Sequence, residues 1–114
     1  FRNEKSQYLG LINHYKKISK KDNCIQIITE ETALPYLLKK RNCTNYFSPW
    51  YVSPKNIQKD FIKQLMKSQP PIILFSSREI RFMPKFKQVV LYIEENYELH
   101  SKYESWTFLK IKKK

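Results

Sequence analysis

The sequence alternates between stretches with the period of an amphipathic helix and short runs of β-branched or other apolar residues. The stretches with helical spacing are 6–18, 29–41, 54–68 and a last one opened by Pro84. The short runs are 24–29, 43–47 and 72–75, followed by two strand-like segments at 99–103 and 106–111. Strands that alternate with helices favour a parallel sheet covered on both faces. We therefore expect one soluble α/β domain over residues 1–114, with a three-layer, Rossmann-like, mainly parallel sheet and a C-terminal antiparallel hairpin.

Composition excludes several classes of protein. The chain has one glycine among 114 residues, so a glycine-rich phosphate loop or dinucleotide fingerprint is not expected. Its longest wholly apolar run, Ile72–Phe75, is far shorter than the roughly 20 residues of a membrane span. This run and Ile25–Ile28 are the expected core strands.

The net charge of +12, from 22 Lys and Arg against 10 Asp and Glu, indicates an acidic partner such as an anionic membrane surface or nucleic acid. A genome whose base composition favours Lys, Ile, Asn and Tyr would produce the same excess. Nucleic acid is the less favoured partner, because no glycine-rich or aromatic RNA-binding motif accompanies the basic residues.

Polar and aromatic residues follow the expected strands at their carboxyl ends, where α/β sheets usually bind ligands. The candidate binding residues are Glu30, Glu31, Trp50, Tyr51, Ser76, Ser77 and Arg78. Carboxylates accept hydroxyl hydrogens and an indole stacks on an apolar ring face, so a sugar would suit this set. The alternative is that the glutamates are first-turn helix acids and the serines a capping loop.

The opposite edge of the expected sheet gathers the cations that end the first two helices. This candidate membrane-facing edge consists of Lys16, Lys17, Lys20, Lys21, Lys39, Lys40 and Arg41. Such an edge would meet lipid phosphates. Complementation of the helix dipoles by solvated side chains is the competing interpretation.

No catalytic, metal or cofactor residues are assigned in this chain. His14 lies on a helix and His100 on a hairpin strand, and neither stands at a strand-to-helix elbow beside a serine. Glu30 and Glu31 are adjacent, so they cannot flank one glycosidic bond. The two cysteines are too few for a cysteine-only zinc site.

Cys24 and Cys43 open two strands that would be parallel neighbours, so a disulfide between them is a candidate. Two buried free thiols remain the alternative, because a one-residue shift in either strand would turn a thiol to the opposite face.

The order of motifs resembles a known family over residues 6–111. The segments that carry the resemblance are Thr29–Arg41, Tyr46–Trp50, Ile57–Ile62, Pro70–Phe75 and Tyr92–Glu98, with the closing hairpin. They are similar to the C-terminal soluble domain of polytopic membrane glycosyltransferases related to dolichyl-phosphate-mannose protein mannosyltransferases and the bacterial aminoarabinose transferase.

The resemblance implies an accessory domain of a polyprenyl-phosphate-sugar-dependent glycosyltransferase that helps bind acceptor or shapes the active-site entrance. The chain would then be the C-terminal part of a longer membrane protein. It would lie on the extracytoplasmic side of a bacterial membrane, against the membrane-embedded part of its parent and near anionic headgroups or a sugar acceptor. The family's catalytic acid lies elsewhere in the parent, so no residue here inherits that role. A free-standing binding module for an anionic partner is the alternative.

Overall fold

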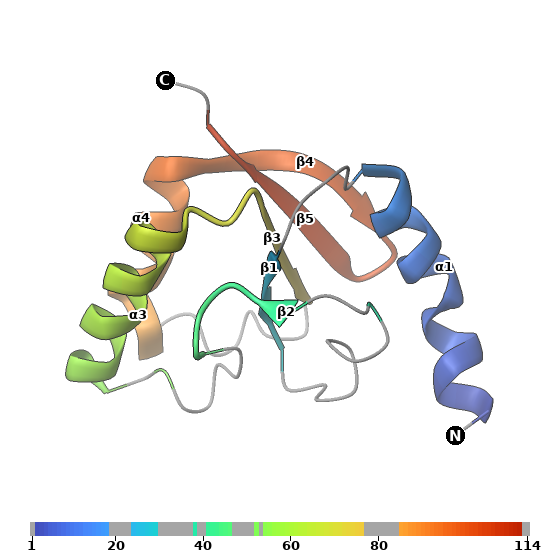
Figure 1. Cartoon of the computed structure of the whole chain (residues 1–114), viewed down its shortest axis with the longest axis horizontal. Helices are drawn as coiled ribbons and strands as arrows, with labels where there is room; N and C mark the ends of the chain where they lie inside the picture. Colours follow the sequence, from blue (N-terminus) through green and yellow to red (C-terminus); the bar gives the residue numbers. More distant parts are fainter. Residues whose placement is uncertain are drawn as a thin grey trace.

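The computed structural model describes residues 2–18, 24–29, 38, 41–46, 52, 54–76 and 85–112, with side chains described from Tyr8 onward. Its elements are α1 (Arg2–Ile18), β1 (Cys24–Ile28), β2 (Arg41–Asn42), α3 (Lys55–Ser68), β3 (Ile72–Ser76), α4 (Lys87–Asn96), β4 (Tyr97–Tyr103) and β5 (Trp106–Ile111) (Figure 1). None of the helices in these ranges is both long and apolar enough to cross a membrane.

The five strands form one mixed sheet in the order β2-β1-β3-β5-β4. The pairs β1–β2 and β1–β3 are parallel, whereas β3–β5 and β4–β5 are antiparallel. The prediction of a three-layer, Rossmann-like, mainly parallel sheet is therefore wrong. The chain is a small mixed α/β domain in which the antiparallel ladders contain more residue pairs than the parallel ones.

The observed sheet departs from the predicted Rossmann-like sheet after β3. Helix α4 ends at Asn96 and β4 begins at Tyr97 without an intervening loop. In a Rossmann-like sheet the next strand would pair with β3, but here β4 forms the edge and β5 fills the place between them. Strand β4 is parallel to β3 because two antiparallel pairings separate them, so β3–α4–β4 is a split βαβ unit.

Two apolar clusters cover the two faces of the sheet. On one face α1 contributes Leu11 and Tyr15, which pack with Ile25, Ile27 and other buried side chains. On the other face α3 and α4 contribute side chains such as Phe61, Leu65 and Val89. Figure 1 shows α1 on one side of the sheet, with α3 and α4 together on the other. Alternation along β1 thus divides its residues between the two helical layers.

The two expected core strands are present and adjacent. Gln26 pairs with Ile73, Ile27 with Leu74, and Ile28 with Phe75. All of these residues are buried except Phe75, which is half-buried.

Several boundaries differ from the sequence-based expectation. The second strand is Arg41–Asn42 and not 43–47, so Cys43 follows a strand instead of opening one. Helix α4 begins at Lys87, after a short 3-10 turn at 85–86. The hairpin is formed as expected, with its turn at Glu104–Ser105, but β4 already starts at Tyr97. Of the expected helix over 29–41, Leu38 is described as helical, and residues 30–37, 39 and 40 lie outside the described residues.

Candidate functional site

Of the candidate sugar-binding residues, Ser76 lies in the described part of the chain. This residue ends β3, pairs with Trp106 of β5, and is 1% exposed. Its side chain is therefore part of the interior at the carboxyl end of the sheet. The remaining candidates, Glu30, Glu31, Trp50, Tyr51, Ser77 and Arg78, lie outside the described residues.

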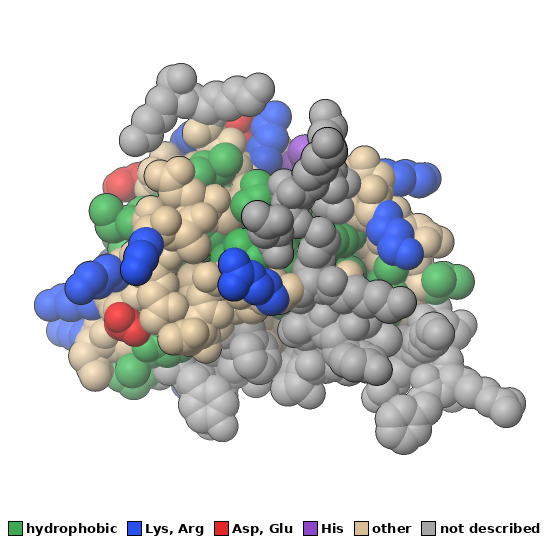
Figure 2. All heavy atoms as spheres, viewed as in Figure 1, with side chains coloured by type: hydrophobic (Ala, Val, Ile, Leu, Met, Phe, Trp, Pro, Cys, Tyr) green, Lys and Arg blue, Asp and Glu red, His purple; other side chains and the backbone are tan. Residues whose placement is uncertain are grey.

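Three members of the candidate basic edge are described, and all three are exposed. Lys16 and Lys17 occupy the last turn of α1, and Arg41 begins β2. Lys20, Lys21, Lys39 and Lys40 lie outside the described residues. Further Lys and Arg side chains gather on the side of the molecule where α3 lies (Figure 2).

Cys24 and Cys43 are joined by a disulfide, with sulfurs 2.07 Å apart and Cα atoms 5.1 Å apart. The backbone N–H of Cys43 also donates to the carbonyl oxygen of Ile25 at 3.0 Å. The bond therefore ties the start of β1 to the residue that follows β2. Since β2 has two residues, this covalent link reinforces the shortest strand of the sheet.

The Asn42 side chain extends the ladder that β2 itself is too short to continue. Its Oδ1 accepts the backbone N–H of Ile27 at 2.8 Å, in the place of a strand carbonyl. Its Nδ2 donates to the carbonyl oxygens of Thr44 and Tyr46 at 2.9 and 2.7 Å. One amide thus fixes the segment after β2 against β1.

Gln26 completes this polar network from inside the core strand. The side chain is fully buried, and its Nε2 donates to the carbonyl oxygens of Tyr46 and Ile27 at 2.8 and 3.0 Å. The Thr44 hydroxyl donates to Gln26 Oε1 at 2.7 Å. A polar residue in an apolar run is stable here because each of its groups is paired.

The same segment is also held by α3. The backbone N–H of Asn45 donates to Gln64 Oε1 at 2.8 Å, and the Tyr46 hydroxyl donates to Asp60 Oδ2 at 2.6 Å. The hydrogen bond to Asp60 raises the pKa of Tyr46 above its ordinary value. Residues 43–46 are thus fixed by a disulfide, a side-chain network and a helix, directly before the segment that carries Trp50 and Tyr51.

Sequence reasoning did not find this anchor. The run 24–29 predicts a buried strand with no role for the Gln26 side chain, and Asn42 lies between the expected helix 29–41 and the expected strand 43–47. The available signal was the polar Gln26 inside Ile25–Ile28, since a buried amide requires partners.

A second buried amide positions α4. Gln58 of α3 is 4% exposed. Its Nε2 donates to the Lys85 carbonyl oxygen, and its Oε1 accepts the N–H of Gln88, both at 3.1 Å. It thereby satisfies a backbone donor in the first turn of a helix whose N-cap makes no side-chain hydrogen bond.

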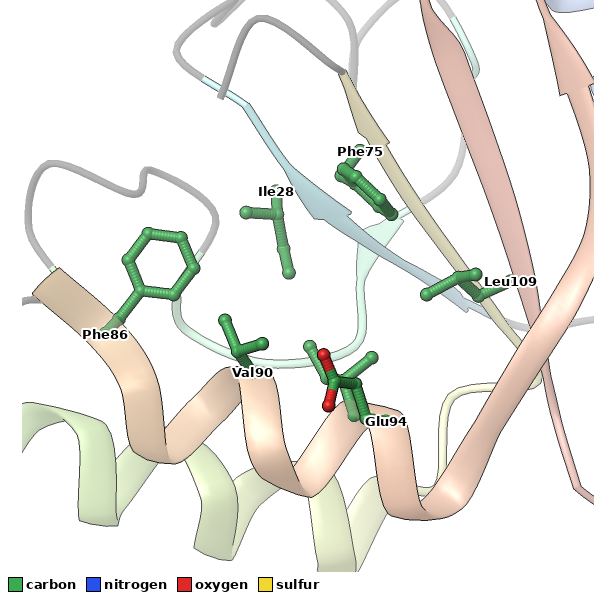
Figure 3. Close-up of a pocket in the computed structure, with 7 residues that line it drawn as sticks. Ile28, Phe75, Phe86, Val90, Glu94 and Leu109 are labelled. Atoms are coloured by element: carbon green, nitrogen blue, oxygen red, sulfur yellow. The ribbon is translucent and has the colours of Figure 1, made fainter. Parts of the chain in front are cut away.

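An apolar cavity of about 210 Å³ lies between the sheet and α4 (Figure 3). The residues that line it are Ile28, Phe75, Phe86, Val90, Ile93, Leu109 and Glu94. Apart from Glu94, whose side chain is exposed, the lining is apolar.

Both histidines of the chain contact one serine. His14 Nε2 of α1 and His100 Nδ1 of β4 each lie 2.9 Å from Ser101 Oγ. His14 also packs against the rings of Phe108 and Tyr103, with centroids 4.9 and 5.8 Å away. The hydroxyl can donate to one imidazole while it accepts from the other, so the cluster docks α1 on β4. Within the described ranges, no group of three or more His, Cys, Asp or Glu side chains is arranged to hold a metal ion.

Comparisons with protein-family models, curated protein sequences and solved structures found no match to this chain.

Proposed function

We propose that this chain is an accessory domain of a polyprenyl-phosphate-sugar-dependent membrane glycosyltransferase, on the extracytoplasmic side of a bacterial membrane. The order of motifs in the sequence supports this proposal. The Pro70–Phe75 motif leads into β3, and Tyr92–Glu98 joins the end of α4 to β4 and the closing hairpin.

The observation that carries the proposal is the disulfide between Cys24 and Cys43. Disulfides persist in oxidising compartments and are rare in the cytosol, where thiols are kept reduced. This bond supports placement outside the cytoplasm, on the side where the resemblance puts the acceptor-binding domain.

The polar network around Asn42 supports a role in shaping the site. It anchors residues 43–46, and Trp50 and Tyr51 follow within five residues of Tyr46. Aromatic side chains stack on the apolar faces of sugar rings. In this proposal Trp50 and Tyr51 bind the acceptor at the entrance of the parent enzyme's active site.

The test uses the full parent chain in intact cells. A membrane-impermeant maleimide is applied to sphaeroplasts before and after reduction, and its attachment to Cys24 and Cys43 is measured by mass spectrometry. We expect labelling only after reduction. Trp50→Ala and Tyr51→Ala variants should lower the transfer of labelled sugar from a polyprenyl-phosphate donor by membranes, at unchanged protein level.

A matched control is Tyr92→Phe, which alters an aromatic residue in the C-terminal half of α4 and should leave transfer unchanged. Reduced thiols in cells, or a parent chain that sediments with no membrane, would contradict the proposal.

A further inference from the structure

Four lysines follow one another along α3 at intervals of four residues. They are Lys55, Lys59, Lys63 and Lys67, and all four side chains are exposed. We call this surface the α3 lysine face. Helix α3 lies on the side of the molecule where Figure 2 shows Lys and Arg side chains close together.

Local helix energetics do not explain the α3 lysine face. Like charges four residues apart destabilise a helix, and a cation in the first turn opposes the helix dipole. Lys67, in the last turn, is the member that the dipole favours, whereas Lys55 begins the helix and no acid occupies that turn. Asp60 accepts hydrogen bonds from Tyr46 and Gln64. The helix itself therefore gains nothing from this row of charges, whereas an external anionic partner would be attracted to it.

An exposed apolar side chain lies within the same face. At about 100° per residue the four lysines span about 120° of the helix circumference, and Met66 falls within that arc. Along the helix axis Met66 is next to Lys67, and it also lines a pocket with Tyr92 and Glu95 of α4. Met66 is 58% exposed. Cations around an exposed apolar residue are typical of a helix that lies on a lipid interface, where the apolar group enters the headgroup boundary. Lysine stems can bury their methylenes there while the ammonium groups reach phosphate.

The opposite side of α3 is occupied by the protein core. Phe61 and Leu65 are buried against the sheet and α4, and Gln58 is bonded to Lys85 and Gln88. The helix is thus held rigidly by one side and presents the other to solvent. The lysine side of the helix is therefore held in a fixed position at the surface, where it can meet an anionic surface.

We propose that the α3 lysine face docks this domain on an anionic membrane surface, with Met66 entering the headgroup region. This inference rests on the proposed function for its cellular setting, and it names the surface that meets the lipid. That surface differs from the candidate edge formed by the ends of the first two helices. Each lysine near an anionic bilayer contributes about a fivefold gain in binding, and salt weakens that gain.

The experiment is co-sedimentation of the 114-residue chain with vesicles of phosphatidylcholine alone or mixed equally with phosphatidylglycerol. We expect binding to the mixed vesicles, little binding to the neutral ones, and a marked loss when salt rises from 50 to 300 mM. Equal binding to both vesicle types would overturn the proposal.

Matched variants locate the surface. Lys55→Gln, Lys59→Gln, Lys63→Gln and Lys67→Gln are combined in one protein. Lys16→Gln, Lys17→Gln, Lys102→Gln and Lys110→Gln are combined in the other, so both lose the same charge from exposed positions. We expect the first protein to lose at least about 100-fold in binding and the second less than about tenfold. Equal losses would show a response to net charge alone and would overturn the α3 assignment.

Two further measurements test the apolar contribution of Met66 and distinguish lipid from nucleic acid as the partner. Met66→Gln should weaken binding to the mixed vesicles about threefold and leave its salt dependence unchanged, because it removes an apolar contact. Tighter binding of oligo(dT) than of the mixed vesicles at the same salt would assign the surface to nucleic acid and overturn the proposal. Because none of these measurements involves sugar transfer or thiol labelling, failure here is distinguishable from failure of the proposed function. Circular dichroism checks that each variant is folded.

Discussion

The hydroxyl of Tyr103 occupies the space that a Cβ atom on Gly10 would need. Gly10 lies in the middle of α1, and Tyr103 is the last residue of β4. The one glycine of the chain thus allows close approach between a helix and an edge strand. Its φ is not positive, so lack of a side chain, and not backbone conformation, explains its position.

Gly10→Ala should destabilise the fold by about 1 kcal/mol, measured by urea unfolding. Alanine favours the helix by about 1 kcal/mol, but overpacking against Tyr103 costs about 1–3 kcal/mol. In a Tyr103→Ala background no side chain occupies the space beside Gly10, so Gly10→Ala should stabilise the protein. A stabilising effect of Gly10→Ala in both backgrounds would contradict this contact.

Reduction of the Cys24–Cys43 bond should lower the free energy of unfolding by about 3 kcal/mol, the value expected for closing a loop of this length. The sequence separation is 19 residues. Urea unfolding with and without a phosphine reductant measures the difference. Cys24→Ser/Cys43→Ser should unfold as the reduced protein does and should not respond to reductant; unchanged stability on reduction would argue against the bond.

Asn42→Ala should cost about 2–3 kcal/mol, because it leaves the buried N–H of Ile27 without its acceptor. Hydrogen exchange of the Ile27 amide should accelerate in the same variant. Asn56→Ala is the control, since Asn56 is exposed on α3 and its replacement should change stability by less than about 0.5 kcal/mol. Similar losses in the two variants would refute the ladder role of Asn42.

Tyr97 should make the fold sensitive to alkali. Burial raises the pKa of its hydroxyl well above the ordinary value, with a smaller contribution from Tyr92, and the hydroxyl donates to the Pro70 carbonyl oxygen at 2.5 Å. The folded state then keeps a proton that the unfolded state releases, so stability is retained below pH 10 and falls above it.

The expected loss above pH 10 is up to about 1.4 kcal/mol per pH unit. Urea midpoints measured between pH 8 and 11 test it, and Tyr97→Phe should show a shallower decline. Tyr92 also has a raised pKa because of burial, so some decline should remain in that variant. An equally steep decline would assign the effect to other tyrosines.

Much of the local structure could be predicted, because burial imposes a period on the sequence. The helical spacing over 54–68 predicted the helix that runs from Lys55 to Ser68. The two apolar runs gave β1 and β3, and the turn at Glu104–Ser105 gave the hairpin. In each case one element's own residues carried the signal.

The sheet order could not be predicted, because periodicity shows which side of a strand is buried and not which strand lies beside it. Leu109 of β5 pairs with both Ile73 and Leu99, and nothing in the pattern of residues 106–111 distinguishes an inner strand from an edge. The network around Asn42 was missed for a related reason. Its members are separated by up to 20 residues, and a single amide has no period.

The position of β5 sets the order in which the domain can be completed during synthesis. Residues 106–111 lie between β3 and β4, so β3 lacks one neighbour until that segment has left the ribosome. Until then the edge of β3 that pairs with β5 has no hydrogen-bonding partner, although β3 is an apolar strand that is mostly buried in the folded domain. An emerging chain in this state offers a template for wrong strand pairing. Pausing before the last strand should therefore favour aggregation, whereas pausing after it should not.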